Sequence, residues 1–193
     1  MILVPSLAVL PFYPALSFFL VLGAFIYVFI YTIWLKPRTL LNIVVGGAAG
    51  SAAVMSGGAA AGAWRDAGVI ILALLVFLWT PTHFWSLAIL YREDYARATV
   101  PMLPVSATVR QSAWWVLLHT GAAGLAAFLL ALTPGLGWLY FIPVLLSTAD
   151  LMVRNFRLIR DPTPQHARSL FISSNIYLLV LLIAICVGSV LPF

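Results

Sequence analysis

The chain has 193 residues, of which 64% are apolar and only 8% are charged, and its formal net charge is +5. Globular domains in water carry about 25% charged residues, so this composition excludes a water-soluble fold and is typical of a protein that lies in a lipid bilayer. Ten Lys and Arg residues are too few to predict binding to nucleic acid, and a single cysteine, Cys186, excludes a disulfide framework.

Six apolar segments are each long enough to cross a membrane, which takes about 20 residues of helix. Residues 1–14 precede them and contain three prolines, which predicts an interfacial segment or the remnant of an earlier helix. In chain order, the predicted spans lie near 16–35, 42–62, 69–91, 112–132, 137–157 and 170–191. Only helices and closed barrels satisfy backbone hydrogen bonds in lipid, and these segments do not alternate as barrel strands do. The sequence therefore predicts an all-α polytopic membrane helix bundle of about six transmembrane helices, in a single domain covering residues 1–193.

The connections between the predicted spans differ in charge. Nine of the ten Lys and Arg residues lie in or beside the connections after the first, third and fifth spans, and Arg65 alone lies in one of the others. Cytoplasmic connections of membrane proteins carry an excess of basic residues. The sequence therefore predicts that Glu93 and Asp94, which follow the third span, face the cytoplasm and that Gly135 lies on the opposite side.

Residues 79–105, WTPTHFWSLAILYREDYARATVPMLPV, contain two of the five acids, one of the three histidines and three prolines. Pro81 lies within an apolar span and predicts a kink, because proline removes a backbone hydrogen bond. His83 and Asp94 are eleven residues apart, about three helical turns, so both would project from one face if the helix continued. Carboxylates at a membrane surface can hold Mg²⁺ and arginines can pair with phosphate, which predicts a polar site at the end of this span.

This segment resembles the second signature of the haem O synthases (protohaem farnesyltransferases), a branch of the UbiA-type membrane prenyltransferase superfamily. In that signature, a TPPHFW-type helix leads into a YR-acid-DYA-basic-AGVPMLPV loop. Residues 31–36 and 42–50 are similar to the family's preceding segments, so about 75 residues, 31–105, align in order. The chain has Thr82 where the family usually has a second proline. It also has Thr99 where the family usually has glycine, which predicts an altered backbone at that position.

The resemblance implies an enzyme, a prenyltransferase of about nine spans. Such an enzyme moves a farnesyl group from farnesyl diphosphate to a vinyl group of haem B, giving haem O for haem-copper oxidase assembly. It also implies two acidic loops that hold the diphosphate through Mg²⁺, the second of which corresponds here to Glu93 and Asp94. The first loop has no counterpart in this sequence. The chain is therefore interpreted as an N-terminally truncated copy, and we expect it to be weak or inactive alone.

The resemblance further implies a location and partners. The bacterial inner membrane is the expected location, with the acidic segment on its cytoplasmic side. Farnesyl diphosphate, haem B and the lipid bilayer are the expected partners, and haem A synthase or oxidase assembly proteins are further candidates.

Asp94 and Glu93 are the predicted metal ligands and, with His83, the predicted catalytic residues. His83 is either a haem contact, as iron ligand or as a group near the reacting vinyl, or a packed imidazole bonded to a carbonyl freed near Pro81. The substrate-binding candidates, which can pair with phosphate or propionate or line the substrate cavity, are Arg92, Arg97, Tyr91, Trp79, Phe84, Trp85, Asn42, Lys36 and Arg38. Asn42 is alternatively a helix cap.

The sequence leaves two other functions open. A non-catalytic membrane component that binds haem or an assembly partner is favoured by the single acidic motif. A small transporter is disfavoured, because no span interior contains an acidic residue that indicates ion coupling. Two further patterns concern packing: Gly46 and Gly50 predict a close helix approach, and Asp150 and Arg154 predict an ion pair.

Overall fold

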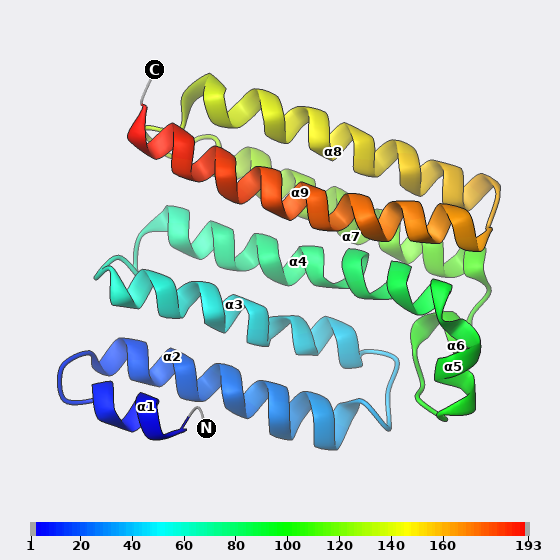
Figure 1. Cartoon of the computed structure of the whole chain (residues 1–193), viewed down its shortest axis with the longest axis horizontal. Coiled ribbons are helices and arrows are strands. Elements are labelled where there is room, and N and C mark those ends of the chain that lie inside the picture. Colours follow the sequence, from blue (N-terminus) through cyan, green and yellow to red (C-terminus); the bar gives the residue numbers. More distant parts are fainter. Residues whose placement is uncertain (1–2, 192–193) are drawn as a thin grey trace.

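The computed structural model describes residues 3–191, and long helices run back and forth through it (Figure 1). The elements are α1 (Leu3–Val9), α2 (Pro14–Phe25), η1 (Ile26–Leu35), α3 (Asn42–Ala60), α4 (Ala67–Leu90), α5 (Arg92–Arg97), α6 (Leu103–Ser106), α7 (Val109–Leu130), α8 (Gly137–Arg160) and α9 (Pro164–Val190). No strand occurs between residues 3 and 191, so the predicted all-α membrane bundle is confirmed.

Six spans were predicted, but only five segments of the described chain are both long enough and apolar enough to cross a membrane. Within the described residues, five segments meet both conditions: α2 together with η1, α3, α4, α7 and α9. α8 is as long as α4, but Asp150, Arg154 and Arg157 lie in its second half. The predicted sixth helix therefore exists, and these charges exclude it from the set of clearly apolar spans.

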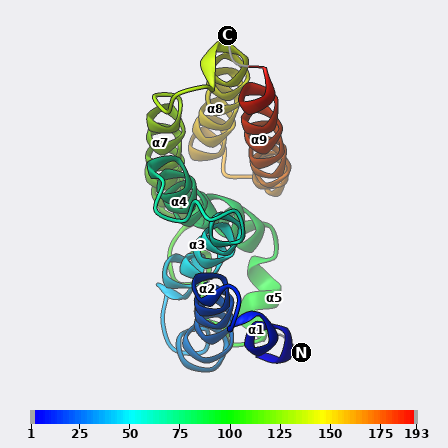
Figure 2. The ribbon, with the colours of Figure 1, turned by 90° about the vertical axis from the view of Figure 1, so that its left-hand side faces the viewer.

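An end view shows how the helices are grouped (Figure 2). α4, α7, α8 and α9 form a four-helix bundle in which each helix contacts two others of the group. Leu75, Val116, Tyr140 and Leu170, one from each helix, are fully buried in it. α3 packs on α4, and α2 packs on α3, so these helices extend the bundle as a single layer.

The first predicted span has the predicted extent but not a regular α-helical form. From Ile26 to Leu35 the chain is a π-helix, and the Lys36 N–H donates to the Tyr31 carbonyl, five residues back, at 2.8 Å. A Cβ atom at Gly46 would lie 2.7 Å from Cδ2 of Tyr31, and one at Gly50 would lie 3.1 Å from Cγ1 of Val76. The predicted close packing is thus confirmed, although the two glycines make room for different helices.

The segment before the first span forms the short helix α1, which packs on α2. Its Ser6 carbonyl accepts a hydrogen bond from the Ser17 hydroxyl at 2.6 Å. Residues 1–2 lie outside the described part of the chain. An interfacial position for this segment stays a prediction.

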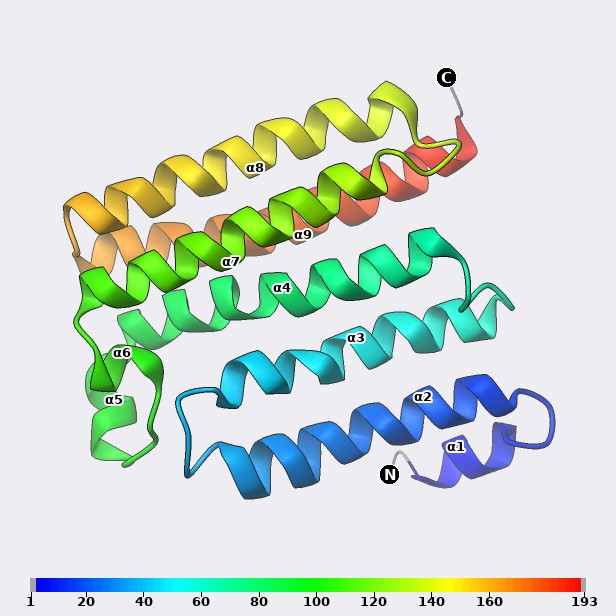
Figure 3. The same ribbon diagram turned by 180° about the vertical axis from the view of Figure 1, so that it is seen from behind.

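The two ends of the bundle differ as the charge pattern predicts. Connections 36–41, 91–108 and 161–163 lie at one end, together with α5 and α6, whereas 61–66 and 131–136 lie at the other (Figure 1 and Figure 3). The nine basic residues are therefore gathered in the third of the bundle that holds Glu93 and Asp94. Which membrane face this end meets stays a prediction.

Candidate functional site

Helix α4 positions the site, and it runs through Pro81 as one continuous helix. Proline has no N–H for the carbonyl of Phe77, four residues back. Gly47 of α3 lies opposite that carbonyl, where a Cβ would be 3.2 Å from the oxygen. The next residue, Thr82, lies 3.1 Å from the hydroxyl of Thr120 on α7. The prolyl turn of α4 is thus held by α3 on one side and α7 on the other.

His83, on α4, lies half-buried at the interface with α9. Its Nδ1 is 3.1 Å from the Ser174 hydroxyl. Trp79 stacks on its ring, with the centroids 4.7 Å apart. The predicted alternative, a bond from the imidazole to a carbonyl freed near Pro81, is wrong, because the described partner is a serine of α9.

The condition under which His83 and Asp94 would share a helix face is not met, because the helix that carries His83 does not continue to Asp94. α4 ends at Leu90, and Tyr91 leaves the helical conformation with φ −105° and ψ 31°. α5 then sets off in a new direction across the end of the bundle (Figure 1). The acidic segment, predicted as a loop, is therefore a short helix with Glu93 and Asp94 in its first turn.

The residues of α5 line a pocket of about 530 Å³ at the basic end of the bundle. Its other walls are the end of α4, Val105, Val109 and the connection from Pro162 to Pro164. Five predicted site residues are brought together here: Tyr91, Arg92, Glu93, Asp94 and Arg97. The pocket thus combines two carboxylates and two guanidinium groups with apolar walls.

Asp94 and Arg97 form an ion pair at 2.5 Å, with side chains that are 61% and 75% exposed. No ion pair within residues 3–191 involves Arg92 or Glu93. Tyr95 packs against the core on the inner side of α5, and burial raises the pKa of its hydroxyl, so it stays neutral at pH 7. α5 is therefore anchored through Tyr95 and presents its charged side chains to the pocket.

The donor set of the pocket is suited to a metal ion that arrives with a phosphate. The described residues contain no group of three or more His, Cys, Asp or Glu side chains that could hold a metal alone. Mg²⁺ commonly takes one or two carboxylates and completes its coordination with water and substrate phosphates. Asp94 and Glu93 fit that smaller requirement.

α5 ends in a turn that the residue at position 99 determines. The Val100 N–H donates to the Tyr95 carbonyl and the Thr99 N–H to the Ala96 carbonyl, both at 3.1 Å, in the pattern of a Schellman motif. That motif places its central residue in the left-handed region, and Thr99 has φ +55°. Thr99, a β-branched residue, thus adopts the left-handed conformation that glycine favours, and an altered backbone relative to the family stays a prediction.

We expect Thr99→Gly to raise the free energy of unfolding by about 1 kcal/mol, because glycine adopts a left-handed φ without steric cost. Amide hydrogen exchange at Val100 in lipid nanodiscs would slow correspondingly. Thr99→Ala is the control, because it keeps a Cβ and should gain much less. Equal protection in the two variants would contradict a backbone origin for the strain.

The remaining predicted site residues lie apart from the pocket. Trp79 donates from Nε1 to the Ser174 carbonyl at 2.9 Å, and Phe84 is 38% exposed beside His83. Trp85 is only 3% exposed and meets His119 edge-on. Trp85 is therefore a core residue on the other side of α4, and no described contact takes it towards the pocket.

Three predicted residues lie at the connection before α3. Asn42 is fully buried and donates from Nδ2 to the carbonyls of Thr39 at 2.7 Å and Pro101 at 3.4 Å. It is not the helix cap, since that position is Leu41. Lys36 lies over the Tyr31 ring at 5.9 Å, and Arg38 donates to the last carbonyls of η1. Asn42 thus ties this connection to the segment after α5, and substrate roles for all three stay predictions.

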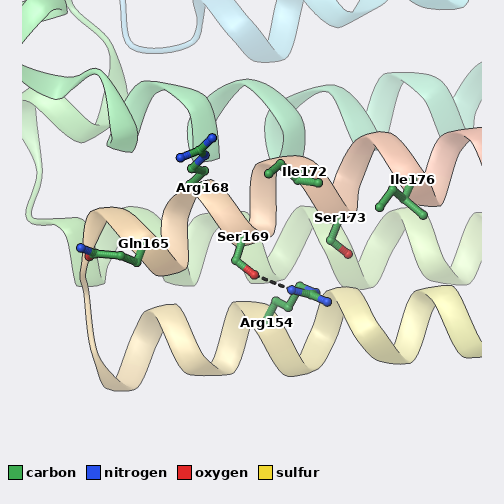
Figure 4. Close-up of a pocket in the computed structure, with 7 residues that line it drawn as sticks. All are labelled: Arg154, Gln165, Arg168, Ser169, Ile172, Ser173 and Ile176. Carbon is green, nitrogen blue, oxygen red and sulfur yellow. Dashed lines mark hydrogen bonds between the residues drawn. The ribbon is translucent and has the colours of Figure 1, made fainter.

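A second cluster of arginines, between α8 and α9, does not converge on one point. Arg154 forms the predicted ion pair with Asp150 at 2.7 Å and also donates to Ser169. Arg168 extends from the other side of α9, away from Arg154 (Figure 4). These residues border a pocket of about 330 Å³. Of its two arginines, only Arg154 forms an ion pair within residues 3–191.

Sequence reasoning missed two contributors to the site. Ser174 holds both His83 and Trp79, and residues 162–164 close the pocket beside α5. The adjacent serines 173 and 174, in a largely apolar segment, were the sequence feature that could have indicated the role of Ser174. No local sequence feature indicates that residues 162–164 close the pocket.

The profile of the UbiA prenyltransferase family matches residues 1–187. The chain belongs to this family. Within it, the chain is 45% identical over 172 residues to a protein of Metallosphaera sedula named protoheme IX farnesyltransferase, covering 89% of the chain and 60% of that protein. It is 42% identical over 178 residues to the protein of that name from Sulfolobus acidocaldarius, covering 92% of the chain and 62% of the relative. It is 47% identical over 167 residues to protoheme IX farnesyltransferase 1 of Paramagnetospirillum magneticum, covering 86% and 59%.

The resemblance seen in residues 31–105 thus extends over most of this UbiA-family chain. The chain spans about three fifths of the length of these relatives. No solved structure matches it. Membership of a prenyltransferase family favours an enzyme over a transporter.

Proposed function

We propose that this chain supplies the α5 pocket of a protohaem farnesyltransferase, which transfers a farnesyl group from farnesyl diphosphate to a vinyl group of haem B. The observation that supports this most is the placement of residues 91–97. The only clustered acidic motif of the sequence meets two arginines in one pocket, at one end of an otherwise apolar bundle. The names of the relatives supply the acceptor and the prenyl length.

The chemistry begins when the bond between the allylic carbon and the diphosphate oxygen breaks. The terminal vinyl carbon then forms a carbon–carbon bond to the allylic carbon, and the carbocation left beside the porphyrin ring takes up water, which releases a proton. Negative charge develops on the departing diphosphate, so cationic groups near it lower the barrier. Arg92 and Arg97 donate to phosphate oxygens. Asp94, with Glu93 in support, would hold Mg²⁺, which would supply neutralisation of the diphosphate charge.

The ion pair between Asp94 and Arg97 holds both side chains at the pocket until the magnesium diphosphate binds. Exposed pairs contribute only about 0 to 1 kcal/mol, so a magnesium diphosphate can separate them at little cost. Asp94 would then be free to hold the metal, and Arg97 would be free to donate to the phosphate. Leu90, Val105 and Val109 form apolar walls against which the prenyl chain can pack.

The proposed location is the bacterial inner membrane with α5 on the cytoplasmic side. The gathering of nine basic residues at the α5 end supports this orientation. Farnesyl diphosphate can then enter from the cytoplasm, where the charged pocket opens. Haem O formed in this way would serve haem-copper oxidase assembly, with haem A synthase or oxidase assembly proteins as partners.

A product assay tests the proposal. The chain in lipid nanodiscs is incubated with haem B, farnesyl diphosphate and Mg²⁺, alone and with the unmatched portion of the Metallosphaera sedula relative as a second polypeptide. We expect slow conversion to farnesylated haem alone and faster conversion with the second polypeptide, seen by mass spectrometry and lost on chelation. If haem binds but no product forms, with or without the second polypeptide, the result would instead support a non-catalytic membrane component that binds haem. The small number of metal ligands among the described residues favours that alternative.

A further inference from the structure

The His83 ring is clamped in one orientation at the interface of α4 and α9. Trp79 stacks on it with the planes 22° apart, and Phe171 of α9 lies 4.7 Å from it, centroid to centroid. Phe84 meets it edge-on at 5.0 Å. Trp79 is itself held by its hydrogen bond to the Ser174 carbonyl. The ring therefore has little freedom to rotate, and the state of its two nitrogens is determined by their surroundings.

The direction in which the Ser174 hydroxyl donates its hydrogen determines which nitrogen of the His83 ring is protonated. A hydroxyl has one hydrogen to donate, and the Ser174 Oγ lies 2.7 Å from the Phe171 carbonyl oxygen and 3.1 Å from Nδ1 of His83. Two oxygens tolerate a 2.7 Å separation only with a hydrogen between them, so Ser174 donates to Phe171. It must then accept from His83, which places the imidazole hydrogen on Nδ1.

The other ring nitrogen, Nε2, is left with a free lone pair. No described residue forms a hydrogen bond with it, and it is not among the enclosed polar atoms that lack a partner. The two other histidines differ. His119 has an enclosed Nδ1 without a partner, beside Trp85. His166 lies at the polar end of the bundle, where its Nδ1 meets the Asp161 carbonyl at 2.8 Å.

We propose that Ser174 fixes His83 as the Nδ1–H tautomer and that Nε2 is an axial ligand to the iron of a haem bound against α4. Imidazoles that bind metals usually donate their second N–H to an oxygen, which orients the ring and raises its basicity. Phe84, which meets the His83 ring edge-on and is 38% exposed, provides an apolar surface for the porphyrin. The choice of haem as the ligand rests on the proposed function, whereas the tautomer does not.

The depth of His83 is consistent with this role. It precedes the end of α4 at Leu90 by seven residues, which is about 10 Å along a helix. An iron bound there lies within the apolar layer, whereas the charged pocket of α5 lies at its surface. A vinyl group on the porphyrin edge that points towards α5 can then approach the allylic carbon next to the diphosphate.

Nitrogen-15 NMR of histidine-labelled protein in nanodiscs tests the tautomer, because protonated and unprotonated ring nitrogens have different shifts. His119→Gln and His166→Gln assign the three signals. We expect the Nδ1–H form for His83 and a mixture or the opposite form in Ser174→Ala. Ser86→Ala is the control, since its buried hydroxyl donates to the His83 carbonyl and does not touch the ring. An Nε2–H form in the unaltered protein overturns the assignment.

Titration with haem B tests the ligand. We expect the absorption bands of imidazole-ligated haem in the unaltered protein, their loss in His83→Gln and an affinity about tenfold lower in Ser174→Ala. Ser86→Ala and His166→Gln should match the unaltered protein, and iron-free protoporphyrin should bind the unaltered and His83→Gln proteins alike. Unchanged bands in His83→Gln overturn the proposal. Ligation through His83 without farnesyl transfer would count against the proposed function alone.

Discussion

Replacing Asp94 with asparagine is expected to slow haem farnesylation by about 100-fold or more, the size of effect seen when one electrostatic contact to a developing charge is lost. The substitution keeps the shape of the side chain and removes the negative charge that a magnesium diphosphate needs. It is measured as the initial rate of product formation in the two-polypeptide mixture, where the rate is highest. Farnesyl diphosphate binding is followed in parallel, so that a misfolded protein is recognised.

Asp161→Asn is the matched control for this experiment. Asp161 lies at the same end of the bundle, its side chain is 64% exposed, and one of its carboxylate oxygens is 3.4 Å from the imidazole of His166. It does not line the α5 pocket, so its rate should stay within about twofold of the unaltered protein, as for surface substitutions elsewhere. Comparable losses in both variants would show that general surface charge, rather than Asp94, controls the reaction.

The partnership of Asp94 with Arg97 allows a competing explanation, in which the carboxylate only orients the guanidinium. Combining Asp94→Asn with Arg97→Ala separates the two. If Asp94 acts only through Arg97, the double variant should be no slower than Arg97→Ala. Independent roles at the metal and the phosphate predict a further loss. A double variant equal to Arg97→Ala would defeat the assignment of Asp94 to the metal.

The sequence was sufficient for the arrangement of the helices, because the bilayer restricts what an apolar chain can do. Uncharged stretches of sufficient length must be helices, and charges must lie at their ends, which places residues 36–41, 91–108 and 161–163 at one end. It was less informative for α8, whose first half is largely apolar and whose second half carries all of its charged residues. It could not show the π-helix in residues 26–35, which packs through Tyr31 against Gly46.

The sequence predicted the site only where its residues are close together in the chain and chemically distinctive. Tyr91 to Arg97 form a charged cluster in an apolar chain, and the structure gathers them in one pocket. The relation of that pocket to His83 was not predictable, because it depends on the backbone angles of Tyr91 alone. Ser174 is 91 residues from His83 in the chain, and no spacing rule connects positions so far apart.

The close approach of α9 to the connection between α7 and α8 leads to the largest expected loss of stability. A Cβ atom at Gly188 would lie 2.7 Å from the carbonyl oxygen of Leu136 and 3.2 Å from its Cα. These are backbone atoms next to a nearly buried side chain, and they cannot rotate away as a flexible side chain can. We therefore expect Gly188→Ala to lower the free energy of unfolding by about 1 to 3 kcal/mol, the usual range for overpacking.

Gly57→Ala is the control, because it makes the same chemical change within helix α3 where a Cβ would meet nothing within 4 Å. There the methyl group restricts the unfolded chain and favours the helix, so stability should rise by about 0.5 to 1 kcal/mol. The two variants are compared by their unfolding midpoints in the same nanodiscs. Opposite shifts are the expected result. If the unfolding midpoint rises in both variants, the helix preference of alanine dominates, and α9 does not make a close steric contact with Leu136 in the bilayer.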